Sequence, residues 1–199
     1  MEKEIEAKYF IKDKDEIRNK LKENNLSLVK SEFLMKRKTF DSDTIGKWLR
    51  VRDEGDKITM TFKHIIDQNR IDGVNEIEII VNDFEKACAI INQTNYIESS
   101  YQENYREIWR NDEVEIVIDT WPYLPNYIEI EAKSEEIVRK YSDLLGFNLN
   151  EAKFGGVDIL YEIIYNISRK DFMKIKTVTF NNENLHQVLM NQMKSEDKN

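Results

Sequence analysis

Three pairs of glutamates, each separated by one residue, stand in segments that alternate between polar and apolar residues: Glu4/Glu6, Glu76/Glu78 and Glu129/Glu131. Such alternation predicts β-strands, in which residues two apart point to the same face of the sheet. Both carboxylates of a pair would then lie side by side. Clustered carboxylates repel one another and favour a divalent cation. Because no histidine or cysteine accompanies them, the oxygen ligands suit Mg²⁺ or Mn²⁺.

Basic residues occupy matching positions of the same or neighbouring segments: Lys8, Arg50, Arg52, Lys63 and Arg106. Asp119 ends another alternating segment. Lysine and arginine bind phosphate oxygens, and arginine can do so through two hydrogen bonds. If all these strands form one antiparallel sheet whose apolar face is covered by helices, the charged faces point to one side. The combination of carboxylates and bases suits a polyphosphate complexed with a metal ion.

Two arrangements of this charged face are open. In the first, the charged face of an open sheet is exposed to water, and each Glu-x-Glu pair is a solvated surface pair without a functional role. In the second, the sheet closes into a barrel with the charges inside, which also removes exposed sheet edges. Charges in such an interior must pair with one another or bind a ligand, because an unpaired buried charge is costly.

The elements that position these residues alternate between groups of strands and single helices. Strands are expected at 3–10, 33–40, 47–53, 57–64, 75–81, 101–109, 113–119 and 127–132. Helices are expected to begin after Asp13, Asp83 and Ser134, because aspartate and serine are good N-cap residues. A fourth helix is expected after the Gly155-Gly156 pair. The tail is weakly patterned, and we expect a last strand at 172–180 and a loose helix at 182–194.

Composition excludes several classes of protein. The 199 residues include 30 Lys and Arg against 38 Asp and Glu, a net charge of −8, with 11% aromatic residues. The aromatic content argues against a disordered acidic chain, and the acidity argues against indiscriminate nucleic-acid binding. The single cysteine excludes a disulfide within the chain, and the two histidines give little support for a zinc site. The six glycines form no glycine-rich phosphate loop. The charged N-terminus and the lack of a long apolar run favour a cytoplasmic protein without a signal peptide or membrane contact.

An ordered set of motifs resembles the CYTH superfamily, also called triphosphate tunnel metalloenzymes. The N-terminal Glu4-x-Glu6-x-Lys8 is similar to the family's E-x-E-x-K signature. Further similar elements follow in the family's order: Leu49-Arg50-Val51-Arg52, Thr61-Phe62-Lys63, Glu76-Ile77-Glu78, Arg106, Asp119 and Ile128-Glu129-Ile130-Glu131. The chain departs from the family pattern in having Asn104 and Tyr105 beside Arg106, and Gly155-Gly156 before the late helix.

The resemblance implies an α+β fold, in which an eight-stranded antiparallel β-barrel forms a tunnel and helices pack outside. The tunnel domain would span residues 1–167, and residues 168–199 would form a C-terminal extension. Metal ligands would be Glu4, Glu6, Asp119, Glu129 and Glu131, and the triphosphate would contact Lys8, Arg50, Arg52, Lys63, Arg106 and Lys153. Glu4, Glu6, Lys8 and Lys63 would carry catalysis, and Glu76 and Glu78 would support the bases.

The function expected from the resemblance is metal-dependent hydrolysis of a triphosphate, either tripolyphosphate, thiamine triphosphate or a nucleoside triphosphate. One alternative is a class IV adenylyl cyclase, which makes cyclic AMP and pyrophosphate from ATP. A second is a module that binds polyphosphate or a nucleotide without turnover, and a third is an ordinary interaction domain. The expected partner is a small-molecule triphosphate rather than a nucleic acid, and the chain would be a monomer or a homodimer.

Overall fold

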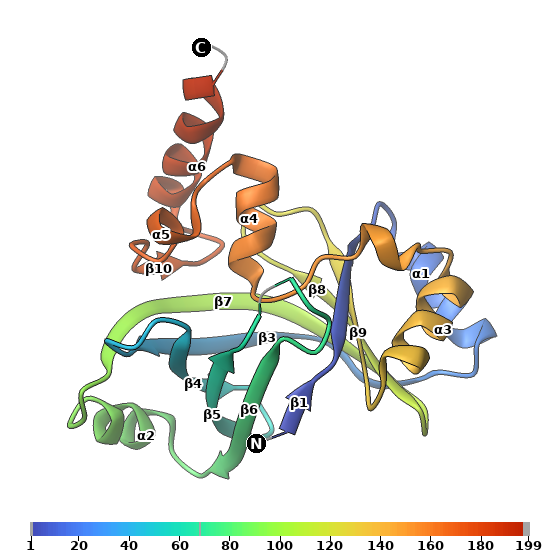
Figure 1. The fold of residues 1–199 in the computed structure, drawn as a ribbon, viewed down its shortest axis with the longest axis horizontal. Coiled ribbons are helices and arrows are strands. Elements are labelled where there is room, and N and C mark those ends of the chain that lie inside the picture. The colour runs from blue at the N-terminus through green and yellow to red at the C-terminus, as the bar shows by residue number, and fades with distance from the viewer. Residues whose placement is uncertain (1, 68, 197–199) are drawn as a thin grey trace.

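A single ten-stranded sheet dominates the computed structural model, which describes residues 2–67 and 69–196 (Figure 1). The strands are β1 (Glu2–Glu4), β2 (Glu6–Phe10), β3 (Ser27–Asp41), β4 (Lys47–Asp53), β5 (Ile58–Ile65), β6 (Val74–Val81), β7 (Ile97–Arg110), β8 (Val114–Thr120), β9 (Tyr127–Ala132) and β10 (Thr177–Val178). Nine of them form the antiparallel path β1-β6-β5-β4-β3-β7-β8-β9-β2, and β10 pairs with β7 in parallel. The expected α+β class is confirmed.

The two ends of this path are consecutive in the chain. β1 pairs with β6 and β2 pairs with β9, with only Ile5 between the two strands. The hydrogen-bond ladder therefore does not close, and "closed eight-stranded barrel" was too strict an expectation. Backbone groups from loops also line this seam, since Glu6 N donates to Ile71 O at 3.3 Å and Lys8 N donates to Lys153 O at 3.0 Å. One N-terminal segment thus contributes to both ends of the sheet.

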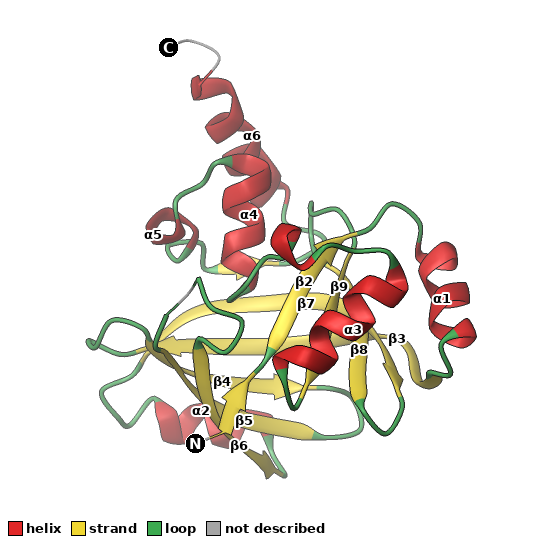
Figure 2. Ribbon diagram, turned by 45° about the vertical axis from the view of Figure 1, so that its right-hand side comes forward, coloured by secondary structure: helices red, strands yellow, loops and turns green. Residues whose placement is uncertain are grey.

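The helices pack around the sheet, and three of them, α1, α2 and α3, cover its apolar outer face (Figure 2). They are α1 (Lys14–Glu23), α2 (Phe84–Ile91), α3 (Glu135–Leu145), α4 (Val157–Tyr165), α5 (Arg169–Phe172) and α6 (Glu183–Glu196), with a 3₁₀ turn at Leu149–Glu151. α1 and α3 share one core cluster with β2, β8 and β9, while α2 packs on Phe40 of β3 and Val51 of β4. Since successive strand residues alternate faces, this covering leaves the charged side chains on the opposite, interior face.

The expected helix starts are confirmed by their caps. The carboxylate of Asp13 accepts from Asp15 N and Glu16 N, that of Asp83 from Lys86 N, and the hydroxyl of Ser134 from Ile137 N. Gly146 ends α3 with φ of 87°, a left-handed conformation that suits glycine. No helix among the described residues is both long and apolar enough to cross a membrane.

The tail differs from the expectation of a strand over 172–180. Phe172 ends the short helix α5, and only Thr177–Val178 pair as a strand, alongside β7. Phe172 turns inward because its ring stacks on Tyr161 of α4, with centroids 4.4 Å apart. Leu185 and Leu189 of α6 are buried in the same cluster as Tyr127 of β9, so the tail packs on the sheet domain.

The packing of α6 can be tested with two neighbouring residues. Leu189 is fully buried, whereas Val188 is 43% exposed. We expect Leu189→Ala to lower the free energy of unfolding by about 2–5 kcal/mol, because it leaves a cavity in the core. Val188→Ala should change it by no more than about 0.5 kcal/mol. Urea denaturation followed by fluorescence measures both, and equal effects of the two substitutions would contradict this packing.

Candidate functional site

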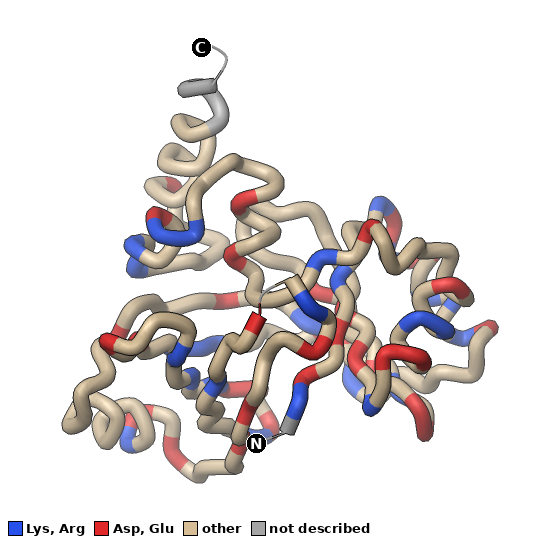
Figure 3. Tube along the Cα trace, in the orientation of Figure 1, with Lys and Arg blue, Asp and Glu red and all other residues tan. Residues whose placement is uncertain are grey.

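The strand registers place the expected site residues on the interior face. Lys8 of β2 lies opposite Glu129 of β9, and Glu6 lies opposite Glu131. In β5, Lys63 lies opposite Glu76 of β6. The remaining pairs are Thr61 with Glu78, Arg50 with Thr61, Arg52 with Thr59, and Arg106 with Asp119. Acidic and basic positions are accordingly interleaved along the strands of the sheet (Figure 3).

Two lysines bridge carboxylates from different strands. The Lys63 ammonium lies 2.5 and 2.7 Å from the two carboxylate oxygens of Glu4 and 3.2 Å from Glu76 Oε2. The Lys8 ammonium donates to Glu6 and lies 3.5 Å from Glu129 Oε1. Lys63 therefore connects β5 with β1 and β6, and Lys8 connects β2 with β9. In this structure, the two ammonium groups supply the positive charge that the surrounding carboxylates need.

Arg106 and Asp119 form the most buried ion pair of the interior. The guanidinium donates to both oxygens of Asp119, at 2.8 and 2.6 Å, and to Glu129 Oε2 at 2.7 Å. The Asp119 side chain is fully buried. Such a bidentate pair fixes the guanidinium in orientation as well as position. Asp119 thus acts in this structure as the partner of Arg106 and is not free to bind another cation.

Arg50 and Arg52 lie further along the interior, on β4. Arg50 Nη2 donates to Thr61 Oγ1 at 3.3 Å, and the hydroxyl of Thr61 donates to Glu78 Oε2 at 2.8 Å. Arg52 Nε donates to Glu54 Oε1 at 2.8 Å. Both guanidinium groups lie 3.6–3.7 Å from Glu78 Oε2, so this one carboxylate faces two cations.

The electrostatic balance differs between the carboxylates. Burial alone would raise the pKa of Glu129, but Lys8 and Arg106 outweigh it and lower the pKa to about 2. Burial would also raise the pKa of Glu4, yet the adjacent Lys63 brings it below its usual value. For Glu6, burial and the charges of Glu4 and Glu129 prevail over Lys8 and raise the pKa to about 8. The pKa of Glu131 rises to about 7, through burial and through neighbouring carboxylates that include Glu4. Burial and the neighbouring carboxylates therefore favour the protonated forms of Glu6 and Glu131 in this structure.

Two expectations need qualification. Lys153 lies beside β2 through backbone hydrogen bonds to Lys8, and its ammonium donates to Glu151 O at 2.5 Å, at the exposed end of a loop. Among residues 2–67 and 69–196, no three acidic, histidine or cysteine side chains converge closely enough to hold a metal ion as they stand. The expected carboxylates share one interior face, but their side chains are directed at the lysines and arginines.

Arg37 of β3 is an interior residue that the sequence analysis missed. It lies opposite Arg52 and is 6% exposed. It stands between Lys36 and Lys38, and a run of three bases resembles a solvated surface. The alternation of Met35, Arg37 and Thr39 was the available signal, because it predicts one shared face for these three residues.

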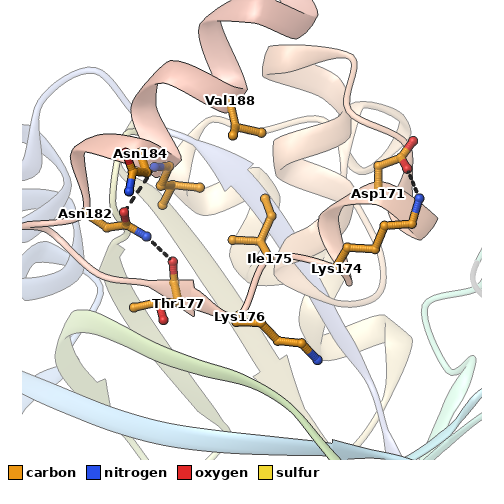
Figure 4. A pocket seen from close by; sticks show the side chains of 9 residues that line it. Asp171, Lys174, Ile175, Lys176, Thr177, Asn182, Asn184 and Val188 are labelled. Carbon is orange, nitrogen blue, oxygen red and sulfur yellow. Dashed lines mark hydrogen bonds and ion pairs between the residues drawn. The ribbon is translucent and has the colours of Figure 1, made fainter.

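A surface cavity of about 570 Å³ lies apart from this interior, between β10, α5 and α6 (Figure 4). Its lining includes Lys174, which pairs with Asp171 at 2.6 Å, and Asn182, which donates to Thr177 O at 2.6 Å. These polar groups satisfy one another within the lining. The cavity contains none of the residues singled out by the motifs.

The raised pKa of Glu6 gives a pH test on metal-free protein. A carboxyl group whose pKa is about 8 when folded and 4.5 otherwise stabilises the folded state below pH 4.5, and this contribution is lost as the pH rises towards 8. We expect Glu6→Gln to flatten the fall of the melting temperature across that window in the presence of a chelator. Parallel pH profiles for Glu6→Gln and the wild type would contradict the account.

Comparison with known proteins supports the same fold. A curated relative from Methanocaldococcus jannaschii is 28% identical over 145 residues, which cover 69% of this chain and 81% of the relative. A solved structure from Vibrio parahaemolyticus has a TM-score of 0.68 at 14% identity and covers 80% of this chain and 97% of its own. Both are named "putative adenylate cyclase". A protein of known structure from Pyrococcus horikoshii has a TM-score of 0.65 at 21% identity, covering 75% and 94% of the two chains.

The family assignment rests on a model of the domain rather than on any single relative. The CYTH domain model matches residues 2–143, which is most of the chain and includes β1 to β9. The match covers the three Glu-x-Glu pairs and the interior bases Lys8, Arg50, Arg52, Lys63 and Arg106. The chain therefore belongs to the CYTH domain family.

Proposed function

We propose that this protein is a metal-dependent hydrolase of a small-molecule triphosphate, which it binds on the interior face of the sheet. The observation that carries the proposal is the interleaving of paired carboxylates with five bases on that face. Interior charges of both signs are costly unless they pair or bind a ligand. A triphosphate with its divalent cation offers negative oxygens to the bases and a positive centre to the carboxylates.

The carboxylates fit a divalent cation by their chemistry. Glu4, Glu6, Glu129 and Glu131 offer only oxygen atoms, as Mg²⁺ and Mn²⁺ prefer. The pKa values of Glu6 and Glu131 are raised to about 8 and 7, first by burial and then by neighbouring carboxylates, and a bound cation would favour their ionised forms. When bound there, the cation would neutralise phosphate charge and activate the attacking water. Lys8 and Lys63, which now hold these carboxylates, would be released towards the phosphates.

The bases are proposed to act by positioning and charge stabilisation. Phosphoryl transfer needs little covalent chemistry from the protein, because the main task is to align the phosphates and stabilise charge on their oxygens. Two hydrogen bonds to Asp119 fix the Arg106 guanidinium in place. Its remaining edge can therefore bind a phosphate without a further loss of side-chain freedom on binding. Glu78 and Thr61 hold Arg50 in a similar way.

Cyclisation of ATP is the second candidate, favoured by the names of the Methanocaldococcus and Vibrio proteins. The same phosphate site would serve, with the ribose 3′-hydroxyl as nucleophile in place of water. The products distinguish the two reactions. Hydrolysis releases phosphate from tripolyphosphate, thiamine triphosphate or ATP, whereas cyclisation converts only ATP and releases pyrophosphate and cyclic AMP.

The proposal predicts turnover that depends on both the metal ion and Glu4. We expect purified protein with Mg²⁺ or Mn²⁺ to release phosphate from at least one of the three triphosphates, and a chelator to abolish the reaction. Glu4→Gln should lower kcat/KM by about 100-fold or more, because charge stabilisation in an enclosed site carries much of the catalysis. A phosphate-release assay measures all of these effects.

A matched control is Glu135→Gln, since this glutamate is exposed on α3 and pairs with Arg139 across one helical turn. It should leave kcat/KM within twofold of the wild type. Cyclic AMP from ATP, without phosphate release from the other substrates, would replace hydrolysis with the cyclase reaction. No turnover of any triphosphate with either metal ion would refute an enzymatic function.

A further inference from the structure

Arg37 is a buried cation that forms no ion pair with an acidic side chain of the described residues. Its Nη2 donates to Asn104 Oδ1, and its guanidinium carbon lies 4.7 Å from the centre of the Trp121 ring. Neither an amide nor an indole ring neutralises a full positive charge. Burial, together with the charges of Arg50, Arg52 and Arg106, brings the pKa of Arg37 well below its usual value. The native fold therefore holds this guanidinium in an unfavourable position.

The nearby carboxylates are already engaged by other residues. Asp119 accepts two hydrogen bonds from Arg106 and one from Asn104 Nδ2, at 3.2 Å. This last bond also fixes the Asn104 amide, so that its oxygen faces Arg37. Glu54 accepts from Arg52 at 2.8 Å. Asp119 and Glu54 thus pair with Arg106 and Arg52, and among the described residues no acidic side chain lies within ion-pair distance of Arg37.

The buried polar atoms without a partner cluster around the same place. Four such atoms of the described residues belong to the interior face: Arg37 Nε, Arg50 Nε, Thr59 Oγ1 and Ser100 Oγ. Strand pairing arranges them in two neighbouring rows, Thr59-Arg52-Arg37 and Arg50-Thr39-Ser100. A fifth atom is Nε1 of Trp121, the residue whose ring faces Arg37. Unpaired buried donors are rare in folded proteins and call for a ligand or an ordered water.

We infer that Arg37 is a fourth guanidinium ligand of the anionic substrate, beside Arg50, Arg52 and Arg106, and that it acts with Arg50, Thr59 and Ser100 at the arginine-rich part of the interior. The inference rests on the proposed function and extends it by naming a residue outside the recognised motifs. A phosphate group supplies what these atoms lack, since its oxygens accept hydrogen bonds from both Nε groups and both hydroxyls, and its charge offsets the three arginines. The opposite part of the substrate, with the metal ion, then faces Glu4, Glu6 and Glu129.

A purely structural role for Arg37 and a role in anion binding predict opposite effects of its removal on the stability of the ligand-free protein. If Arg37 served only to hold Asn104 and Trp121, its removal would destabilise the ligand-free protein. If it is kept for an anion, replacement by an apolar side chain of similar length removes an unpaired buried charge. The ligand-free protein would then gain stability while substrate binding suffers.

The experiment compares Arg37→Met with the wild type by two measurements. We expect the melting temperature of the ligand-free protein to rise, and KM for inorganic tripolyphosphate with Mg²⁺ to increase at least tenfold. The tripolyphosphate concentration that gives half of the maximal rise in melting temperature should increase in parallel. Arg37→Lys should recover part of the loss in KM, because it restores the charge. The control Arg139→Met replaces an arginine that is 54% exposed on α3 and should change neither quantity.

The possible results distinguish the inference about Arg37 from the proposed function. An unchanged KM for Arg37→Met, in an enzyme that hydrolyses the triphosphate, overturns this inference and leaves the proposed function intact. A wild type that neither binds nor hydrolyses tripolyphosphate overturns both. Arg37→Gln keeps an amide donor for Asn104 and serves if Arg37→Met does not fold. A failure of both variants to fold would assign Arg37 a structural role and would also overturn the inference.

Discussion

The pairing of lysines with carboxylates on either side of the break between β1 and β2 is the interaction on which the rest of the structure depends. β1 belongs to one end of the sheet and β2 to the other, and no backbone ladder joins these strands. Lys63 bridges Glu4 and Glu76, and Lys8 bridges Glu6 and Glu129. The continuous chain through Ile5 joins the two ends of the sheet, and the two lysines neutralise the carboxylates on either side of it. Without them, the carboxylates on facing strands would repel one another.

The same contacts explain why a folded protein can keep so much charge inside. Replacing a buried ion pair by apolar groups often leaves stability unchanged or improves it, so these pairs are weak evidence for stabilisation. Their value lies in the chemistry that they permit. The carboxylates are held near one another by ammonium groups that can be exchanged for a metal ion, and the released ammonium groups can then bind phosphate. Carboxylates lie close to one another around Glu6 and Glu131, and arginines lie close to one another around Arg37, at different places in the interior.

Much of this arrangement follows from sequence pattern. Strict alternation predicted β4 to the residue and placed Arg50 and Arg52 on one face, and the capping residues Asp13, Asp83 and Ser134 predicted the starts of three helices. Two features were beyond the pattern. The break at Ile5 depends on where two distant strands, β6 and β9, accept the N-terminal segment. The short helix α5 is accompanied by the stacking of Phe172 on Tyr161, a contact that the weakly patterned tail, with its expected strand at 172–180, did not reveal.

The sequence pattern predicts which site residues share one face of the sheet, but it does not predict the contacts between their side chains. Register and alternation place Glu129 and Arg106 inside, yet they do not reveal that Asp119 would be bound by Arg106 or that Arg37 would lack an acidic partner. Those facts depend on side-chain packing across strands that are distant in the sequence. A crystal structure of the protein with Mg²⁺ and tripolyphosphate tests the central claim most directly. The account predicts the anion on the interior face, between the Glu4–Glu6 segment and Arg37, Arg50 and Arg52, with Lys8 or Lys63 moved onto phosphate oxygens. An anion bound only outside this interior, with the Lys63–Glu4 and Lys8–Glu129 contacts unchanged, would contradict it.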